Sequence, residues 1–253
     1  MADDLPKSQV ALERWLVALE KRHYSELTFQ EVRKGLQAVS AIYVQKRDRL
    51  AEGAVFEGRG KRAAFAIFYG PLHFLAIRAA IRELGGAEPP PTRIADLGCG
   101  TGVAGAAWAL EAGGTPAIDG TERNSWASGE ARLTFQDLGV KGRTTPGDFT
   151  KASLPPKGGA VVAAWAVNEL DDAARASLLP RLLGCGARVL IAEPIAKSPV
   201  PWWGDWAAAF SAKGGRADEW RFPVDLPETL SKLDKAAKLD HRTLSLRTLW
   251  LGG

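Results

Sequence analysis

Residues 93–103 read RIADLGCGTGV, and their order is that of a strand, a glycine-rich loop and a helix. The apolar run at residues 93–97 is typical of a buried strand, and it leads directly into a loop with glycine at positions 98, 100 and 102. Residues 103–112 then carry apolar side chains at helical spacing. In an open parallel sheet, such a loop lies at the carboxyl end of a strand, where ligands bind. The segment therefore predicts a ligand-binding turn.

Downstream of this loop, apolar strands alternate with helices. Strands are predicted at residues 116–120, 143–145, 160–167 and 187–193, and helices at residues 125–138 and 173–183. This alternation is typical of an α/β fold with a doubly wound, mostly parallel sheet that has helices on both faces. Residues 219–224 and 244–251 alternate like strands around a helix at 227–239, which predicts an antiparallel edge hairpin and seven strands in all.

Upstream of the loop, the chain is predicted to be helical. Apolar residues recur at helical spacing within residues 6–52, and Thr28 with Glu31 three positions later matches a capping box. We expect a loop at residues 53–60 and a further helix after Gly70-Pro71. These helices form an N-terminal helical region that precedes the sheet.

A proline-rich segment, residues 87–92, gives the strongest domain boundary. We therefore predict a helical region or lid over residues 1–88 and a ligand-binding α/β domain over residues 89–253. A chain of 253 residues has room for one large domain with such an appendage.

The composition excludes several classes of protein. Hydrophobic residues make up 46% and charged residues 25%, as in globular proteins that dissolve in water. The N-terminus is polar and acidic, unlike a signal peptide. No uninterrupted apolar run reaches the roughly 18 residues that span a bilayer, because Pro71, His73 and Arg78 break the longest candidate. We expect a cytoplasmic protein that is not embedded in a membrane.

The potential metal ligands are few and scattered. Cys99 and Cys185 cannot form a four-thiolate site, and the three histidines, at positions 23, 73 and 241, form no metal-spaced pair. We therefore predict two reduced thiols and no metal.

The spacing of the glycine loop separates two kinds of nucleotide ligand. A dinucleotide loop has the order G-x-G-x-x-G, but this loop has G-x-G-x-G, and Val103 stands where the third dinucleotide glycine belongs. Asp96, directly before the loop, suits a ligand that carries a cationic amine. The loop therefore favours S-adenosylmethionine, with Asp96 receiving its methionine end, and NAD is not expected.

Acidic residues after the next two strands suit the nucleoside part of such a ligand. A carboxylate at the tip of the second strand can accept both ribose hydroxyls. Glu122 and Asp119 compete for this role, and we favour Glu122 because it lies later in the strand. After the third strand, Asp148 can accept from the adenine amino group and Phe149 can cover the ring, although Asp148 can equally cap a turn.

Together these motifs resemble those of class I S-adenosylmethionine-dependent methyltransferases. The resemblance rests on Asp-x-Gly-x-Gly-x-Gly at residues 96–102, an acid after the second strand and Gly-Asp after the third, and it covers residues 60–253. It implies a Rossmann-like fold, S-adenosyl-L-methionine as cofactor and methyltransferase activity. The implied cofactor contacts are Asp96, Gly98, Cys99, Gly100, Gly102, Glu122, Asp148 and Phe149.

A narrower resemblance is to the ribosome-associated methyltransferase-like family, which includes mitochondrial small-subunit assembly factors. It rests on WAVNEL at residues 165–170, VLIAEP at residues 189–194 and Tyr69-Gly70-Pro71. The cysteine-rich segment of that family is replaced here by PVPWWGDW at residues 199–206. This departure removes any expectation of an iron–sulfur cluster or zinc.

The candidate catalytic residues are Asn168, Glu169 and Tyr69. Asn168 and Glu169 follow the fourth strand, beside the expected position of the reactive methyl group, where Asn168 can orient an acceptor and Glu169 can act as a base. Asn168 can instead be a helix N-cap. Tyr69 precedes the linker on the element that should cover the pocket, and His73 is a weaker candidate there.

Three hypotheses for the substrate remain open. A basic stretch favours an RNA or ribosomal component; its members are Lys46, Arg47, Arg49, Arg59, Lys61 and Arg62. A small-molecule substrate is the second hypothesis, suggested in part by the tryptophans at 202, 203 and 206. Trp202 and Trp206 have the helical spacing of core residues, or the tryptophans form an aromatic lid that stacks on a nucleobase or an aromatic metabolite. The third hypothesis is a non-catalytic ribosome assembly factor that keeps the methyltransferase fold.

Overall fold

A seven-stranded sheet forms the centre of the protein. The computed structural model describes residues 7–45, 54–195 and 200–253. Within these residues the strand order is β3-β2-β1-β4-β5-β7-β6. The strands are β1 (Arg93–Leu97), β2 (Ala117–Glu122), β3 (Gly142–Pro146), β4 (Ala160–Ala164), β5 (Arg188–Glu193), β6 (Arg216–Pro223) and β7 (Thr243–Leu251). Only the pairs that involve β7 are antiparallel. The predicted α/β fold class, with its antiparallel edge hairpin, is confirmed.

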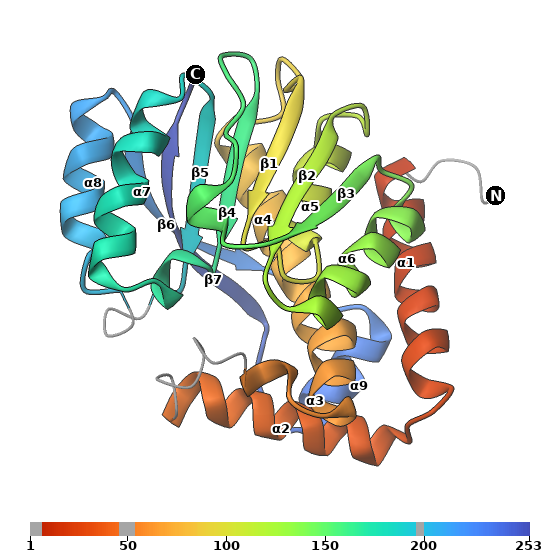
Figure 1. Ribbon diagram of the computed structural model, residues 1–253. Coiled ribbons are helices and arrows are strands. Elements are labelled where there is room, and N and C mark those ends of the chain that lie inside the picture. Colours follow the sequence, from red (N-terminus) through yellow and green to blue (C-terminus); the bar gives the residue numbers. More distant parts are fainter. Residues whose placement is uncertain (1–6, 46–53, 196–199) are drawn as a thin grey trace.

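Helices cover both faces of this sheet (Figure 1). One face carries α4 (Gly70–Glu83), α5 (Val103–Glu111) and α6 (Ser125–Leu138), and the other carries α7 (Asp172–Gly184) and α8 (Trp203–Ala212). Each layer has its own buried apolar cluster, one on each side of the strands. Because β1, β2 and β4 are parallel, their carboxyl ends meet at one edge of the sheet. Helices α2 and α3 lie beyond that edge (Figure 1).

The N-terminal residues form the expected helices α1 (Lys7–Tyr24) and α2 (Phe29–Gln45). The predicted capping box at the start of α2 is confirmed. The Glu31 carboxylate accepts from the Thr28 N–H at 2.8 Å, and the Thr28 hydroxyl accepts from the Glu31 N–H at 3.3 Å. Trp15 and Leu36 from these helices share one apolar core with Ile94 of β1, so the helical region packs directly against the sheet. The domain boundary at residue 88 stays a prediction.

The third helical segment is longer than the sequence predicted. It begins at Arg59 as α3 (Arg59–Ala64), widens into a π-helix at Phe65–Tyr69 and continues as α4. A proline ring inside an α-helix clashes with the carbonyl four residues earlier, which is why we expected a new helix at Gly70-Pro71. Here the Gly70 N–H donates to the Phe65 carbonyl, five residues back, and the wider turn accommodates Pro71.

Judged by length and composition alone, this continuous helix could cross a membrane. It spans Arg59–Glu83, and 78% of its most apolar window is buried inside the protein. A core helix passes the same test, so the observation is weak evidence for a membrane span.

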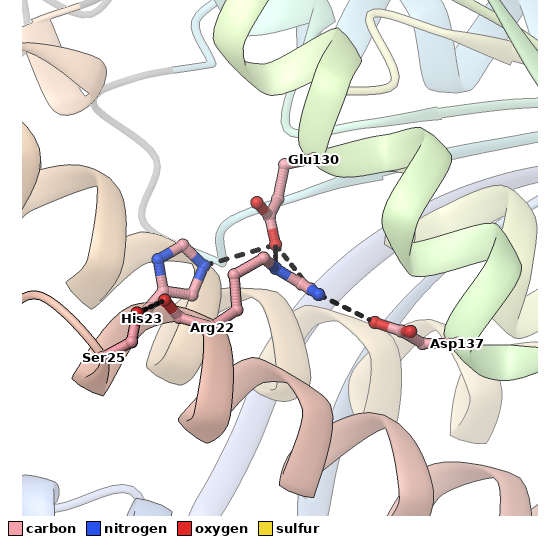
Figure 2. Close-up of polar contacts among 5 residues, drawn as sticks. All are labelled: Arg22, His23, Ser25, Glu130 and Asp137. Carbon is pink, nitrogen blue, oxygen red and sulfur yellow. Dashed lines mark hydrogen bonds and ion pairs between the residues drawn. The ribbon is translucent and has the colours of Figure 1, made fainter.

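A cluster of charged and polar side chains, Arg22, His23, Glu130 and Asp137, connects helix α1 to α6 (Figure 2). The Arg22 guanidinium donates to the Glu130 carboxylate at 2.9 Å and 3.1 Å and to Asp137 at 3.1 Å. The His23 ring lies 3.3 Å from the same Glu130 oxygen. Glu130 is 4% exposed, so its charge depends on these donors rather than on water. Burial opposes ionisation of Glu130, but His23 and Arg22 outweigh it and lower its pKa below 4.5.

We expect the Glu130→Gln substitution to lower the free energy of unfolding by about 2 kcal/mol at pH 7, since it weakens hydrogen bonds to a charged, buried acceptor. The lowered pKa means that the carboxylate stabilises the folded state above pH 4.5 and loses this contribution as the pH falls below that value. Urea unfolding at pH 7 and pH 3.5 measures both effects.

The matched control for Glu130 is Asp137→Asn, because Asp137 pairs with the same Arg22 but is more exposed. This control should cost less than about 1 kcal/mol. Equal unfolding midpoints for wild type and Glu130→Gln would contradict the assigned role of the cluster.

Candidate functional site

The loop after β1 opens onto a cavity through Gly100. Gly98, Gly100 and Gly102 have φ angles of 65°, 51° and 79°, a region that side-chain-bearing residues rarely adopt. A Cβ on Gly102 would lie 2.7 Å from the Phe135 ring, so this glycine is required by packing against α6. A Cβ on Gly100 would meet no atom within 4 Å. Gly102 therefore serves the fold, whereas Gly100 leaves space for a ligand.

Asp96 lies beneath this loop and is 1% exposed. One of its carboxylate oxygens accepts from the Gly105 N–H of α5 at 2.8 Å. Burial raises the pKa of Asp96 to about 7, with the Gly105 hydrogen bond acting in the opposite direction and Glu122 adding to the increase. A nearby cation would stabilise the ionised form of this buried carboxyl group, because opposite charges attract.

Glu122, at the tip of β2, is braced by backbone amides. Its two oxygens accept from the Gly100 N–H at 2.9 Å and from the Asn124 N–H at 2.7 Å. Each oxygen keeps a further lone pair for a ligand hydroxyl. Asp119, the competing candidate, is instead held by Arg93 and Arg143 and does not line this cavity. Of the two acids, only Glu122 is positioned for a ligand here.

Asp148 and Phe149 follow β3 and line the same cavity. The Asp148 carboxylate accepts from the Thr150 N–H at 2.9 Å and from the Thr150 hydroxyl at 2.7 Å, and these hydrogen bonds lower its pKa. Asp148 therefore caps the short turn at Phe149–Lys151, the alternative left open by the sequence. Its position in the cavity wall is also compatible with a ligand contact.

The cavity has a volume of about 590 Å³ and joins five parts of the chain: the N-terminal helical region and the segments at the carboxyl ends of β1, β2, β3 and β4. It is lined by most of the residues predicted to bind a cofactor and by Glu169, whereas Gly102, Asn168 and Tyr69 are not part of its wall. The N-terminal region contributes Val55, Phe56, Phe65 and His73. The predicted lid therefore reaches the cavity, through residues that sequence reasoning did not select apart from His73.

The placement predicted for Tyr69 is wrong. This side chain is 9% exposed and lies in the apolar core. Its hydroxyl is hydrogen-bonded to Ser40, and burial raises its pKa to about 12. The extra residue in the π turn changes which side chains of this helix face the cavity, and Phe65 and His73 take the position expected for Tyr69. Helical spacing alone gives no sign of such a turn.

Asn168 also differs from its predicted place. Strand β4 ends at Ala164, three residues earlier than predicted, because Trp165 adopts a left-handed φ of 55°. The Asn168 N–H donates to the Glu193 carboxylate at 3.0 Å, and its side-chain oxygen is buried without a partner among the described residues. Asn168 therefore belongs to the support of the turn rather than to the cavity wall.

Glu193 is a residue that sequence reasoning missed. It ends β5, is fully buried, and accepts from the backbone N–H groups of Val167 and Asn168. Burial, the leading cause, raises its pKa well above the ordinary value. The carboxylate thus holds the turn that carries Trp165 and Glu169. An acid directly after a buried strand was the available signal, since carboxyl ends of parallel strands share one edge.

Aromatic side chains form another part of the cavity wall. The rings of His73 and Trp165 lie 3.9 Å apart and nearly parallel, at 14°. The Phe65 ring is 6.1 Å from His73 and 4.9 Å from Phe56. Burial lowers the pKa of His73 to about 3, and His241 adds to the effect. His73 is therefore a neutral ring at physiological pH.

Glu169 faces the cavity from the turn after β4. It pairs with Arg123 at 3.3 Å, and 33% of its side chain is exposed. Burial raises its pKa to about 7, partly offset by Arg123, while Glu122 adds to the increase. A carboxyl group with a pKa near the working pH can accept and release protons readily.

The three tryptophans that the sequence offered as an aromatic lid lie away from the cavity wall. Trp202 and Trp206 are buried in the core around α7 and α8, on the other face of the sheet, and Trp203 packs against that core. The core alternative for these tryptophans is the one that the structure supports. Among the described residues, no three histidine, cysteine or acidic side chains are grouped for a metal.

The basic stretch is only partly described. Lys46, Arg47 and Arg49 lie outside the described residues, and the remaining three have partners within the protein. Arg59 pairs with Glu26, and Arg62 donates to the Phe56 carbonyl at 2.7 Å. Lys61 donates to the Ala54 carbonyl at 2.6 Å and pairs with Glu57. These contacts hold the lid segment in place.

Comparison with known proteins supports the fold. No protein-family model matches the chain, and no curated protein matches it. A mitomycin 7-O-methyltransferase is 16% identical with a TM-score of 0.51, over 99% of this chain and 74% of its own. A candidate O-methyltransferase of Nostoc punctiforme is 12% identical with a TM-score of 0.52, over 87% and 72%. The chain therefore has the fold of class I S-adenosylmethionine-dependent methyltransferases.

Proposed function

We propose that this chain is a methyltransferase that binds S-adenosylmethionine in the cavity and methylates a small molecule held beside it. The observation that carries the proposal is the single cavity shared by the glycine loop, Glu122 and the aromatic side chains of the lid. Cofactor and acceptor would meet there, and the lid would exclude water from between them.

The residues present fit the proposed cofactor. Gly100 leaves open the space that a Cβ would occupy, so the backbone can approach a ligand closely. Asp96 would hold the ammonium group of the methionine end and Glu122 the ribose hydroxyls. Asp148 and Phe149 would contact the adenine. When bound, S-adenosylmethionine supplies a methyl group that is electrophilic because it is attached to a positively charged sulfur.

The chain's own contribution is then positioning and proton transfer. Trp165 and His73 would orient a flat acceptor, and holding reactants in the right geometry supplies a large part of the rate enhancement in such reactions. Glu169 would take a proton from the acceptor if it arrives protonated. The brace from Glu193 keeps Trp165 and Glu169 on one rigid turn.

The small-molecule acceptor is supported by the partners of the basic residues. An RNA-binding entrance needs cations that are free to meet phosphates. Among the described basic residues, the half-buried Lys61 and Arg62 donate to backbone carbonyls of the helical region. This preference reverses the order suggested by the basic stretch in the sequence, which placed RNA or a ribosomal component first.

Titration calorimetry with S-adenosylhomocysteine and with NAD tests this proposal. We expect saturable one-to-one binding of the first compound and none of the second. NAD binding that competes with S-adenosylhomocysteine would refute it. A ribosomal role would appear as binding to ribosomal RNA near physiological salt, with affinity falling about 0.7 log unit per log salt for each phosphate neutralised. Cofactor binding without methyl transfer to any acceptor would support a non-catalytic role.

A pH dependence of cofactor affinity follows from Asp96. Its pKa of about 7 means that the ligand must displace a proton at lower pH, so binding should strengthen by roughly tenfold between pH 6 and pH 8. Calorimetry in buffers of different ionisation enthalpy would also detect the released proton.

Two variants test whether the pH dependence of cofactor binding comes from Asp96. Asp96→Asn should bind more weakly and with little dependence on pH. Glu169→Gln removes the other cavity carboxyl group whose pKa is about 7, and it should retain the pH dependence. A pH-independent wild type would show that Asp96 does not titrate on binding.

A further inference from the structure

The charges that line the cavity are unbalanced. Four carboxylates face it and one guanidinium, counted over the described residues; they are Asp96, Glu122, Asp148, Glu169 and Arg123. S-adenosylmethionine brings one net positive charge, which leaves an excess of negative charge even when it is bound. Like charges in a poorly solvated site repel one another strongly. A second cation entering the cavity would therefore be stabilised, and a second anion would be repelled.

Of the four carboxylates, Glu169 has the partner that an incoming ligand can replace most easily. Asp96 and Glu122 accept from backbone amides, and Asp148 accepts from Thr150. Within the part of the chain that the structure describes, the Glu169 side chain pairs with Arg123, whose side chain is 60% exposed. Exposed ion pairs of this kind contribute little stability, so an incoming cation can replace the guanidinium at little cost.

The wall of the cavity that holds Glu169 also carries aromatic rings. Phe65, His73 and Trp165 form a continuous series, with ring centres 6.1 Å and 3.9 Å apart in that order. Aromatic faces attract cations, more strongly when the site excludes water. The lowered pKa of His73 keeps its ring neutral, so it does not repel a positive charge at neutral pH.

From the combination of an acidic cavity, an available carboxylate and an aromatic wall, we propose that the methyl acceptor is an organic amine with a flat apolar body. The inference rests on the proposed function and names the substrate class of that site. The apolar body would stack against Trp165 and His73, and the ammonium group would lie toward Glu169. A carboxylic acid would instead bring a negative charge into an acidic cavity, and a phenol would acquire one there on losing its proton.

The proposed reaction is balanced by one proton transfer. The ammonium gives a proton to the Glu169 carboxylate, which becomes a carboxylic acid and leaves a neutral amine with a lone pair. The nitrogen–carbon bond then forms as the carbon–sulfur bond breaks, and the bonding pair leaves with sulfur. The product is a methylated ammonium ion and a neutral thioether. Glu169 returns its proton to water through its exposed third, which its pKa of about 7 allows.

Calorimetry on the protein saturated with S-adenosylhomocysteine tests the acceptor class. The probes are phenethylamine, 2-phenylethanol and phenylacetate, which share a ring and differ in the polar group, and the matching indole series of tryptamine, tryptophol and indole-3-acetate. We expect the amine to bind at least roughly tenfold more tightly than the alcohol in one series or both, the size of a hydrogen bond between charged groups such as the ammonium and Glu169. The carboxylates should show no binding.

The Glu169→Gln variant should lose the preference for amine over alcohol. Asp172→Asn is the matched control, since Asp172 is a fully exposed carboxylate three residues further along the chain, and it should keep the preference. Alcohols or carboxylates that bind as well as amines would overturn the amine proposal, as would a protein that binds S-adenosylhomocysteine but none of the amines. A protein that does not bind S-adenosylhomocysteine would instead overturn the proposed function.

Discussion

Replacing Gly100 by valine is expected to weaken S-adenosylhomocysteine binding by roughly 100-fold or more while the protein stays folded. The new side chain would enter the open space in front of the loop, where no protein atom lies within 4 Å, so it would overlap the ligand and not the protein. Forcing methyl groups into an occupied volume costs about 1–3 kcal/mol or more, and each 1.4 kcal/mol is tenfold in affinity. Calorimetry gives the affinity, and thermal unfolding confirms that the fold persists.

The matched control for this substitution is Gly113→Val. Gly113 has a φ of 77°, and a Cβ there also meets no atom within 4 Å, but it lies outside the cavity. Both variants carry the cost of a side chain in the left-handed region, about 1–2 kcal/mol. Only Gly100→Val should lose the ligand. Equal affinities for the two variants would show that the ligand does not approach Gly100.

Glu122→Ala is the second substitution with a large expected effect. It removes the acceptor for two ligand hydroxyls, at about 1.5–3 kcal/mol for each hydrogen bond to a charged group. It also removes the brace between the Gly100 and Asn124 amides, which shapes the loop before the ligand binds. We expect the affinity for S-adenosylhomocysteine to fall roughly 100-fold or more, as measured by the same titration.

Asp119→Asn provides the comparison for Glu122→Ala, because Asp119 lies three residues earlier in the same strand and is engaged by Arg93 and Arg143. This variant should bind the ligand within about twofold of wild type, as expected for a residue outside the site. If Asp119→Asn lost affinity and Glu122→Ala did not, the ribose contact would have to be reassigned to Asp119.

The parts of the fold that followed from the sequence are those with a local physical signal. Strand β1 and helix α6 have the predicted bounds, since one is a short apolar run before glycines and the other begins at an Asn N-cap and ends before Gly139. The glycine loop was recognisable because its φ angles require glycine at defined positions. Most of the expected cofactor residues line one cavity because they follow parallel strands, whose carboxyl ends meet at one edge of the sheet.

The errors arose where the backbone departs from regular geometry. A π turn changed the faces of the helix that carries Tyr69, and a left-handed φ at Trp165 ended β4 early and turned Asn168 away from the cavity. Neither feature leaves a pattern in residue spacing. Such irregularities are frequent at functional sites, where the surrounding structure compensates for their cost.

The distribution of charge in the folded protein could not be predicted from the sequence either. The basic stretch suggested a surface for phosphates, but pairing depends on tertiary contacts, and Arg59 meets Glu26 from a distant part of the chain. The acidic lining of the cavity comes from the carboxyl ends of four separate strands and the turns that follow them, so it cannot be recognised until the strands are assembled. The proposed preference for a small-molecule acceptor rests on these two features.

The most direct test of the central claim is a crystal structure of the protein with S-adenosylhomocysteine. We expect the ribose hydroxyls to lie against Glu122, the adenine beside Phe149, and the sulfur toward Trp165 and Glu169, on the side of the cavity that the N-terminal helical region lines. A ligand bound elsewhere, or in this cavity with its ribose away from Glu122, would contradict the assignment of the site.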